Sequence, residues 1–212
     1  MEAMADCTDL IARGAAELGL ELSSDISRTL SNYLNLLVKW SKKLNLVGPA
    51  SKREMAVLHV VDALAVVAHL PADLSSMIDV GSGAGLPAIP VAIARPDVRV
   101  SAIEPIAKKH AFLATARREL SLSNFTPYCR RFEQHRQSAE FAPYEAAVSR
   151  ATFALEQWLE HAKTLIRDGG LIIGMEGARQ IELLPGLTRH PYNLPKTDTG
   201  HERTRALILY QP

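Results

Sequence analysis

A glycine-rich turn near the middle of the chain most constrains what it can fold into. Residues 77–90, MIDVGSGAGLPAIP, predict a short buried strand, a turn with glycine at every second position, and the start of a helix. Because glycine has no Cβ, such a turn lets a ligand lie against bare peptide N–H groups at a helix N-terminus. The alternative is a tight strand–helix connection that binds nothing.

An acidic residue ends the predicted strand that follows the glycine turn. The next predicted strand, residues 98–104, ends in Glu104, which lies 19 residues after Gly85. In dinucleotide-binding folds a carboxylate at about this distance binds ribose hydroxyls. The turn, the following helix and the acid occur together, and this combination favours a binding site over a bare connection.

Composition limits the class of protein. The 212 residues are 47% hydrophobic, enough for one α/β domain with a small appendage. No apolar run approaches the roughly 20 residues of a membrane span, and we expect no signal peptide. Cys7 and Cys129 are far apart and lack His or Cys neighbours, so we expect a reducing cytoplasm, no disulfide framework and no metal site.

The first 70 residues predict helices. A short helix ends near Gly19, and a longer one begins at Ser23 or Ser24, carries an apolar stripe from Leu30 to Leu44 and ends by Gly48-Pro49. A third covers about 55–69. The stripe needs a packing partner, so we expect a helical lobe of residues 1–72 docked on a core of residues 73–212.

After residue 75 the pattern alternates between strands and helices. Strands are predicted at 76–80, 98–103, 124–129, 145–149 and 170–175, and helices at 86–94, 106–120, 152–166 and 177–184. This alternation predicts an α/β fold with a parallel, doubly wound sheet and right-handed crossovers. A clear strand at 205–210 predicts a final antiparallel strand that enters through a hairpin.

Basic residues gather in two segments, although the net charge of the chain is only +1. Residues 26–53 hold six basic residues and no acid, and residues 105–136 hold seven against two acids. Such a distribution is typical of a face that binds an RNA backbone, and solvated helix faces are the alternative.

Several motifs, in order, resemble the RsmG (GidB) family of methyltransferases, which act on a guanine N7 of 16S ribosomal RNA. The glycine turn with its extension is Asp79-Val-Gly-Ser-Gly-Ala-Gly-Leu-Pro-x-Ile-Pro90. The others are Trp40-x-x-x-x-Asn45-Leu46, His59-x-x-Asp62-Ala-Leu64, Lys108-Lys109, Val148-Ser-Arg-Ala151 and Gly169-Gly170.

The resemblance implies a Rossmann-like class I methyltransferase fold, with a mostly parallel seven-stranded sheet and an N-terminal helical extension. It implies S-adenosyl-L-methionine as cofactor and 16S ribosomal RNA or the small ribosomal subunit as partner, with no membrane or DNA partner, in a cytoplasmic monomer. The cofactor-binding residues it implies are Asp79, Gly81, Gly83, Gly85, Leu86, Glu104, Phe132, Glu133 and Arg150.

The same resemblance assigns positioning roles in catalysis, without a general base, to Arg150, His59 and Asp62, and RNA contacts to Asn45, Lys108 and Lys109. The acid-free basic segment adds Lys42 and Lys43 to the expected RNA contacts. Each assignment has a plainer alternative. Asp79 can orient the turn, Asn45 can cap a helix, and Arg150 can form a surface salt bridge. His59 and Asp62 can be a polar pair that packs the two lobes together.

The chain departs from the family pattern at two places. It has Glu104-Pro105 where the family usually has Asp-Ser, and Glu176-Gly177 where it usually has Lys-Gly. The second reverses a charge near the expected active face, unless Glu176 simply faces solvent. Two other functions therefore stay open: a methyltransferase of this fold for a small molecule or protein, and a non-catalytic RNA-binding factor.

Overall fold

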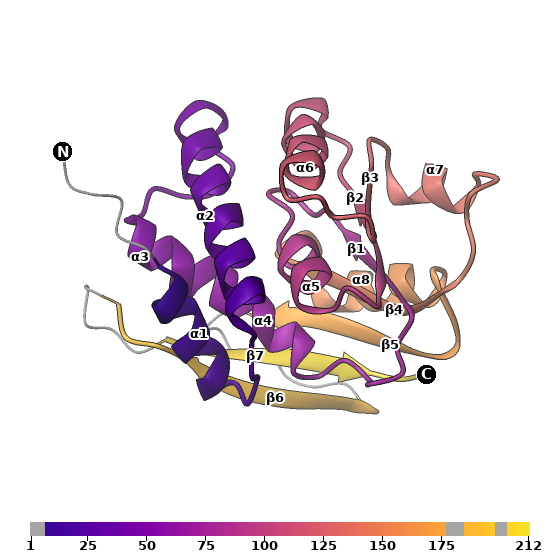
Figure 1. Cartoon of the computed structure of the whole chain (residues 1–212). Coiled ribbons are helices and arrows are strands. Elements are labelled where there is room, and N and C mark those ends of the chain that lie inside the picture. Colours follow the sequence, from indigo (N-terminus) through magenta and orange to yellow (C-terminus); the bar gives the residue numbers. More distant parts are fainter. Residues whose placement is uncertain (1–6, 177–184, 198–202) are drawn as a thin grey trace.

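A twisted sheet forms the centre of the computed structural model, which describes residues 7–176, 185–197 and 203–212 (Figure 1). Within these residues seven strands follow the order β3-β2-β1-β4-β5-β7-β6. The strands are β1 Ser76–Val80, β2 Arg99–Ile103, β3 Phe125–Tyr128, β4 Tyr144–Arg150, β5 Ile166–Glu176, β6 Leu187–Leu194 and β7 Arg203–Tyr210.

The direction of the strands confirms the predicted fold class. Strands β1 to β5 pair in parallel, and β7 runs antiparallel to both β5 and β6. The strand order reverses between β1 and β4, because the chain first adds β2 and β3 on one side and then β4 on the other. In open α/β sheets ligands bind at the carboxyl ends of the strands beside such a reversal.

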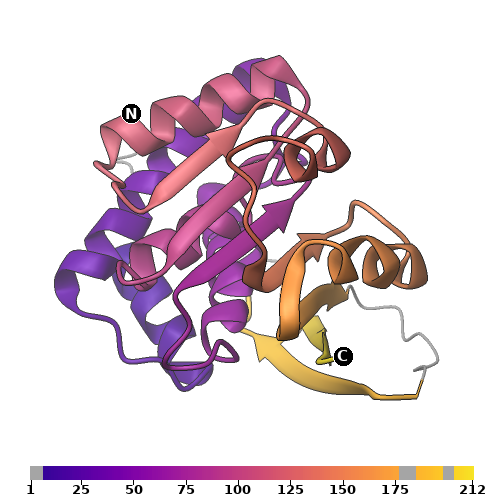
Figure 2. The ribbon, with the colours of Figure 1, turned by 90° about the vertical axis from the view of Figure 1, so that its right-hand side faces the viewer.

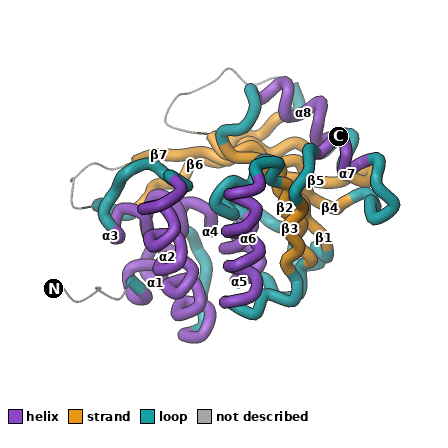
Figure 3. Tube along the Cα trace, turned by 90° about the horizontal axis from the view of Figure 1, so that it is seen from above, coloured by secondary structure: helices purple, strands orange, loops and turns teal. Residues whose placement is uncertain are grey.

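Helices cover both faces of the sheet. Figure 3 shows α5 (Ala88–Ala94) and α6 (Ala107–Glu119) on one side of the strands and α8 (Leu155–Lys163) on the other. The short α7 (Phe132–Arg136) follows β3. The N-terminal helices extend the layer of α5 and α6: α1 Thr8–Glu17, α2 Ser24–Leu44, and a continuous helical stretch of α3 Lys52–Met55, η1 Ala56–Val61 and α4 Asp62–Val67.

Helix α2 begins as predicted and ends earlier. The Ser23 hydroxyl accepts a hydrogen bond from the peptide N–H of Ile26, so Ser23 is the N-cap. The helix ends at Asn45, whose φ of 48° is left-handed, and not at Gly48-Pro49. Asparagine tolerates this conformation better than most residues do. Asn45 is therefore a helix cap, which was the alternative to its assignment as an RNA contact.

Tyr33 on α2 ties the N-terminal helices to the glycine turn. Its hydroxyl donates a 2.7 Å hydrogen bond to the carbonyl oxygen of Ala84, and its ring lies 6.5 Å from that of Phe112 on α6. Burial raises the pKa of Tyr33, which keeps the hydroxyl protonated as a donor. The predicted apolar stripe of α2 thus packs directly against the part of the fold that carries the turn.

One predicted helix differs from the structure, and two elements of the structure were not predicted. The helix at 152–166 is shorter, because β5 already begins at Ile166. Helix α7 and strand β6 were not predicted as elements of their own. Strand β6 contains Pro191, which an edge strand tolerates because its peptide nitrogen need not donate to a neighbour. Figure 2 shows the β6–β7 hairpin at the end of the sheet away from β3.

The predicted helix at 177–184 lies outside the described residues. Among the described helices, none has both the length and the apolar content to cross a membrane.

Candidate functional site

A pocket of about 460 Å³ lies where the strand order reverses. The glycine turn after β1, the residues after β2 and the residues after β4 form its wall, and Leu46 closes one side. Its lining residues are Leu46, Gly81, Ser82, Gly83, Ala84, Leu86, Glu104, Pro105, Ile106, Lys109, Arg150, Ala151 and Thr152.

The three glycines of the turn differ in what surrounds them, although all have positive φ. A Cβ on Gly81 would collide with the side chain of Thr152, and one on Gly85 would collide with Ile89. A Cβ on Gly83 would meet only the Gly81 carbonyl oxygen, at 3.8 Å. Gly81 and Gly85 are therefore required by protein packing, whereas Gly83 borders open space in which a ligand can approach the backbone.

Glu104 holds the turn from the opposite wall. Its carboxylate, in a residue only 3% exposed, accepts hydrogen bonds of 2.8 Å from the peptide N–H groups of Gly83 and Ile106. A carboxylate offers about four acceptor positions, so these two bonds leave capacity for a ligand. The departure from the usual aspartate therefore keeps a carboxylate at the rim of the pocket.

Asp79 does not line the pocket. It is fully buried, and its Oδ2 accepts a 3.3 Å hydrogen bond from the N–H of Ala88 at the start of α5. Burial raises the pKa of Asp79 to about 7, while its hydrogen bonds act in the opposite direction. The contacts of Asp79 are those of a residue that orients the turn.

Arg150, at the end of β4, forms a largely buried ion pair. Its Nη1 lies 3.4 Å from Oδ2 of Asp62 on α4, and their side chains are 22% and 7% exposed. Tyr192 on β6 donates a 2.8 Å hydrogen bond to the other carboxylate oxygen of Asp62. Burial and the neighbouring carboxylate both raise the pKa of Tyr192. The alternative of a surface salt bridge for Arg150 is therefore wrong. No sequence pattern pointed to Tyr192 as a partner of Asp62.

His59 lies on the π-helical turn η1, close to the same cluster. Burial lowers its pKa to about 4, and the positive charge of Arg150 adds to that effect. Its Nδ1 is buried without a hydrogen-bond partner among the described residues. Asp62 contacts Arg150 on β4 and Tyr192 on β6. The acid of the His59–Asp62 motif therefore joins α4 to the sheet.

Phe132 and Glu133 lie on α7, outside the lining of this pocket. The ring of Phe132 lies 4.6 Å from that of His161 on α8 and 6.1 Å from that of Phe153. Glu133 is exposed. Their assignment to an adenine site stays a prediction.

A second hollow, of about 540 Å³, adjoins the first. Lys42 and Asn45 line it, and Leu46 lines both cavities. Lys43 is exposed beside it at the end of α2. Lys108 and Lys109 lie in the first turn of α6, where Lys109 lines the first pocket. Basic side chains therefore border the pocket on two sides.

Glu176 does not face solvent. Its carboxylate lies 2.8 Å from Nη2 of Arg189 on β6, and the Glu176 side chain is only 7% exposed. The charge reversal at the end of β5 is thus matched by a cation two strands away, which sequence reasoning did not single out.

Comparison with known proteins identifies the family. Residues 26–191 match the model of the GidB family, described as rRNA small subunit methyltransferase G. A protein named "Ribosomal RNA small subunit methyltransferase G" from Aromatoleum aromaticum is 37% identical over 208 residues, covering 95% of this chain and 97% of its own. One of the same name from Chromobacterium violaceum is 35% identical, covering 93% and 94%.

Solved structures agree on the fold. An O-methyltransferase from Bacillus cereus in complex with SAH has a TM-score of 0.58 at 14% identity and covers 85% of this chain and 91% of its own. Cofactor-bound Rv0187 from MTB has a TM-score of 0.58 at 15% identity, covering 86% and 89%. The open backbone at Gly83 and the carboxylate of Glu104 fit a ligand of this type. The chain therefore belongs to the rRNA small subunit methyltransferase G (GidB) family, and its cofactor is S-adenosylmethionine.

Proposed function

We propose that this protein methylates N7 of a specific guanine in the 16S ribosomal RNA of the small ribosomal subunit. Family membership supports the reaction class, since the matched relatives are named as small-subunit ribosomal RNA methyltransferases. The choice of N7 rests on the chemistry of the residues around the pocket.

The observation that carries the N7 assignment is the state of the acids and the histidine near Arg150. Asp62 is engaged by Arg150 and Tyr192, and the carboxylate of Glu104 by two peptide N–H groups. His59, with a pKa of about 4, is a weak base at neutral pH. Guanine N7 carries a lone pair and no proton, so its methylation needs no general base. An exocyclic amine or hydroxyl acceptor would need one.

In this proposal the chain contributes alignment and electrostatics. S-adenosylmethionine supplies an electrophilic methyl group when bound. Gly81, Gly83, Leu86 and Glu104 hold the cofactor, and Phe132 and Glu133 border its adenine. Arg150, oriented by Asp62, aligns donor and acceptor, which is the largest source of rate acceleration when no proton moves.

The RNA backbone would cross the basic border of the pocket. Lys42, Lys43 and Asn45 contact it from the end of α2, and Lys108 and Lys109 from the start of α6. Because Leu46 lines both cavities, one strand can pass from the hollow near Lys42 to the pocket. We further propose that residues 1–72 act as an RNA-binding lobe on a cofactor-binding core of residues 73–212.

Methyl transfer from labelled cofactor tests this function. The protein is incubated with small ribosomal subunits, naked 16S RNA or naked 23S RNA, and the label is mapped by nucleotide. We expect one labelled guanine in 16S RNA, with chain cleavage at that base after the reduction and aniline treatment that detects N7-methylguanine. Label on another base, on an exocyclic amine or only on 23S RNA would refute the proposal. The Arg150→Ala variant controls for contaminating activity.

A further inference from the structure

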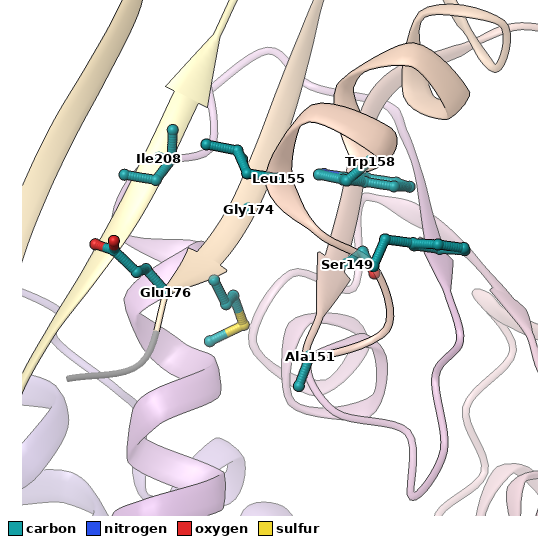
Figure 4. A pocket seen from close by; sticks show the side chains of 9 residues that line it. Ser149, Ala151, Leu155, Trp158, Gly174, Glu176 and Ile208 are labelled. Carbon is teal, nitrogen blue, oxygen red and sulfur yellow. The ribbon is translucent and has the colours of Figure 1, made fainter. Parts of the chain in front are cut away.

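Two hollows adjoin the proposed methyl-transfer pocket, the pocket that Gly83 and Glu104 line. The smaller, of about 150 Å³, shares Ala151 with the pocket and is drawn in Figure 4. Figure 4 shows the carboxylate of Glu176 at its wall, turned toward β7, and that carboxylate is paired with Arg189 at 2.8 Å. No lysine or arginine is among the described residues that line this hollow. Without a cation of its own, it does not suit a nucleotide with its phosphate.

The other hollow lies between the end of α2, the loop 46–50 and α3, and we call it the α2 hollow. Its volume is about 540 Å³, and Leu46 lines both it and the methyl-transfer pocket. Most of its walls are apolar and are formed by Val38, Leu46, Val47, Pro49, Ala50 and Met55. Ligand sites typically combine such apolar walls with a few polar groups.

The walls of the α2 hollow are held in place from both ends. Left-handed Asn45 ends α2, and a capping box begins α3. In that box the Ser51 N–H donates to the Glu54 carboxylate at 2.9 Å, and the Glu54 N–H donates to the Ser51 hydroxyl at 3.1 Å. Leu46 and Met55 are only 9% and 5% exposed, which anchors the loop on the core. The hollow is therefore formed before any ligand binds.

Positive charge borders the α2 hollow. Lys42 lines it, and Lys43 is exposed beside it in the last turn of α2. Within the part of the chain that the structure describes, neither lysine forms an ion pair. A lysine in the last turn also offsets the helix dipole, but the dipole gives no reason for an apolar hollow beneath it. Apolar walls below a cationic rim match the two parts of a nucleotide, a flat base and an anionic phosphate.

We propose that the α2 hollow binds the base of a nucleotide next to the target guanine, with the adjoining phosphate at Lys42. The inference rests on the proposed function and names a second base site for the same RNA strand. Bases of single-stranded RNA splay out into such sites, and a methionine such as Met55 makes favourable contacts with an aromatic ring. Because Leu46 lines both cavities, a base held here brings its neighbour to the mouth of the methyl-transfer pocket.

RNA that lacks a single base tests the site. The substrate is rebuilt with an abasic nucleotide immediately 5′ or immediately 3′ of the labelled guanine. For wild-type protein we expect one of these two changes to raise the KM for RNA about 10-fold, which is within the range for the loss of one stacked base. An abasic nucleotide four positions away controls for loosening of the RNA and should leave the KM unchanged.

A variant that fills the α2 hollow tests the same contact from the protein side. Ala50 is half-buried in its wall, so Ala50→Phe places a ring where the base would lie. We expect it to raise the KM for intact RNA and to reduce the effect of the abasic nucleotide to less than about 2-fold, because the two changes remove one contact. Ala72→Phe, at an exposed position before β1, is the matched control and should keep the full abasic effect. Calorimetry should give both variants the wild-type cofactor Kd.

The outcomes separate this inference from the proposed function. If wild-type protein does not methylate guanine N7, both fail. If it does, but neither neighbouring abasic nucleotide changes the KM or Ala50→Phe keeps the full abasic effect, the second base site is wrong and the proposed function stands. Weaker cofactor binding in folded Ala50→Phe would assign the hollow to the cofactor and overturn the inference. The wild-type comparison needs no variant, so it decides the question even if Ala50→Phe does not fold.

Discussion

Asp62 and Arg150 are 88 residues apart in the sequence, yet Oδ2 of Asp62 lies 3.4 Å from Nη1 of Arg150. This ion pair joins α4, in the N-terminal part of the chain, to the end of β4. Tyr192 joins β6 to the same carboxylate. Three separate segments thus fix Arg150, which lines the pocket at the end of β4.

Tyr192→Phe tests this positioning. The variant removes the hydroxyl that donates to Asp62 and keeps the ring. Loss of a hydrogen bond to a charged, buried group costs about 1.5–3 kcal/mol of stability. We expect a lower Tm and a kcat reduced about 3- to 10-fold through a looser Arg150. Melts and single-turnover rates measure the two effects.

Tyr210→Phe is the matched control, because Tyr210 ends β7 and its ring contacts Lys163 rather than the ion pair. It should keep the wild-type kcat. A Tyr192→Phe variant with lower Tm and unchanged kcat would show that the hydroxyl supports the fold alone.

Gly83→Val should abolish cofactor binding in a folded protein. The side chain would occupy the open space beside the turn. Part of any effect comes from placing valine at a φ of +57°. Gly169→Val controls for that strain, because Gly169 has a φ of +70° and nothing within 4 Å. We expect both variants to lose stability and only Gly83→Val to lose the calorimetric binding signal. Wild-type affinity in folded Gly83→Val would contradict the cofactor site.

Charge reversal at Lys42 and Lys43 should weaken RNA binding and leave cofactor affinity unchanged. Two fewer phosphate contacts lower the slope of log K against log salt by roughly 1.4 on the single-strand scale and roughly 1.8 on the B-DNA scale. Reversal of Lys163 and Arg167, which form ion pairs with Glu160 and Glu145, is the control. Equal slopes for both double variants would show that the RNA does not bind at the end of α2.

The turn, the alternation of strands and helices, and the capping serine of α2 could be predicted from the sequence because each depends on local chemistry. Gly83, Glu104 and Arg150 could be placed at one pocket because parallel strands bring their carboxyl ends to one edge. The end of α2 was misjudged, since left-handed Asn45 ended the helix before the stronger glycine–proline signal.

The contacts of Tyr192 and Arg189 could not be predicted from sequence, because β6 has no clear alternation and carries Pro191 within the strand. Its residues reach their partners only through the order β5-β7-β6. The burial of Glu176 has the same cause: its partner lies two strands away in space.

Two buried groups should give opposite pH dependences of stability. The pKa of His59 is lowered from 6.5 to about 4, so its contribution is present above about 6.5 and is lost as pH falls toward 4. The pKa of Asp79 is raised from 3.8 to about 7, so the folded state keeps a proton that the unfolded chain releases, and stability falls as pH rises from about 4 to 7. Thermal melts of His59→Gln should therefore lose the first slope, and those of Asp79→Asn the second.

The rate of methyl transfer should not depend on pH between about 6 and 9 once cofactor and RNA are saturating, because N7 has no proton to lose. His59 is already neutral throughout this range, given its pKa of about 4. Asp79 titrates near pH 7, but it contacts the start of α5 rather than the pocket, and saturating cofactor should mask its effect on the turn. A wild-type rate that rises with an apparent pKa near 7 and becomes flat in His59→Ala would reveal a general base and point to an amine or hydroxyl acceptor. A rise that becomes flat only in Asp79→Asn would instead trace the pH dependence to the glycine turn, and N7 would remain the acceptor.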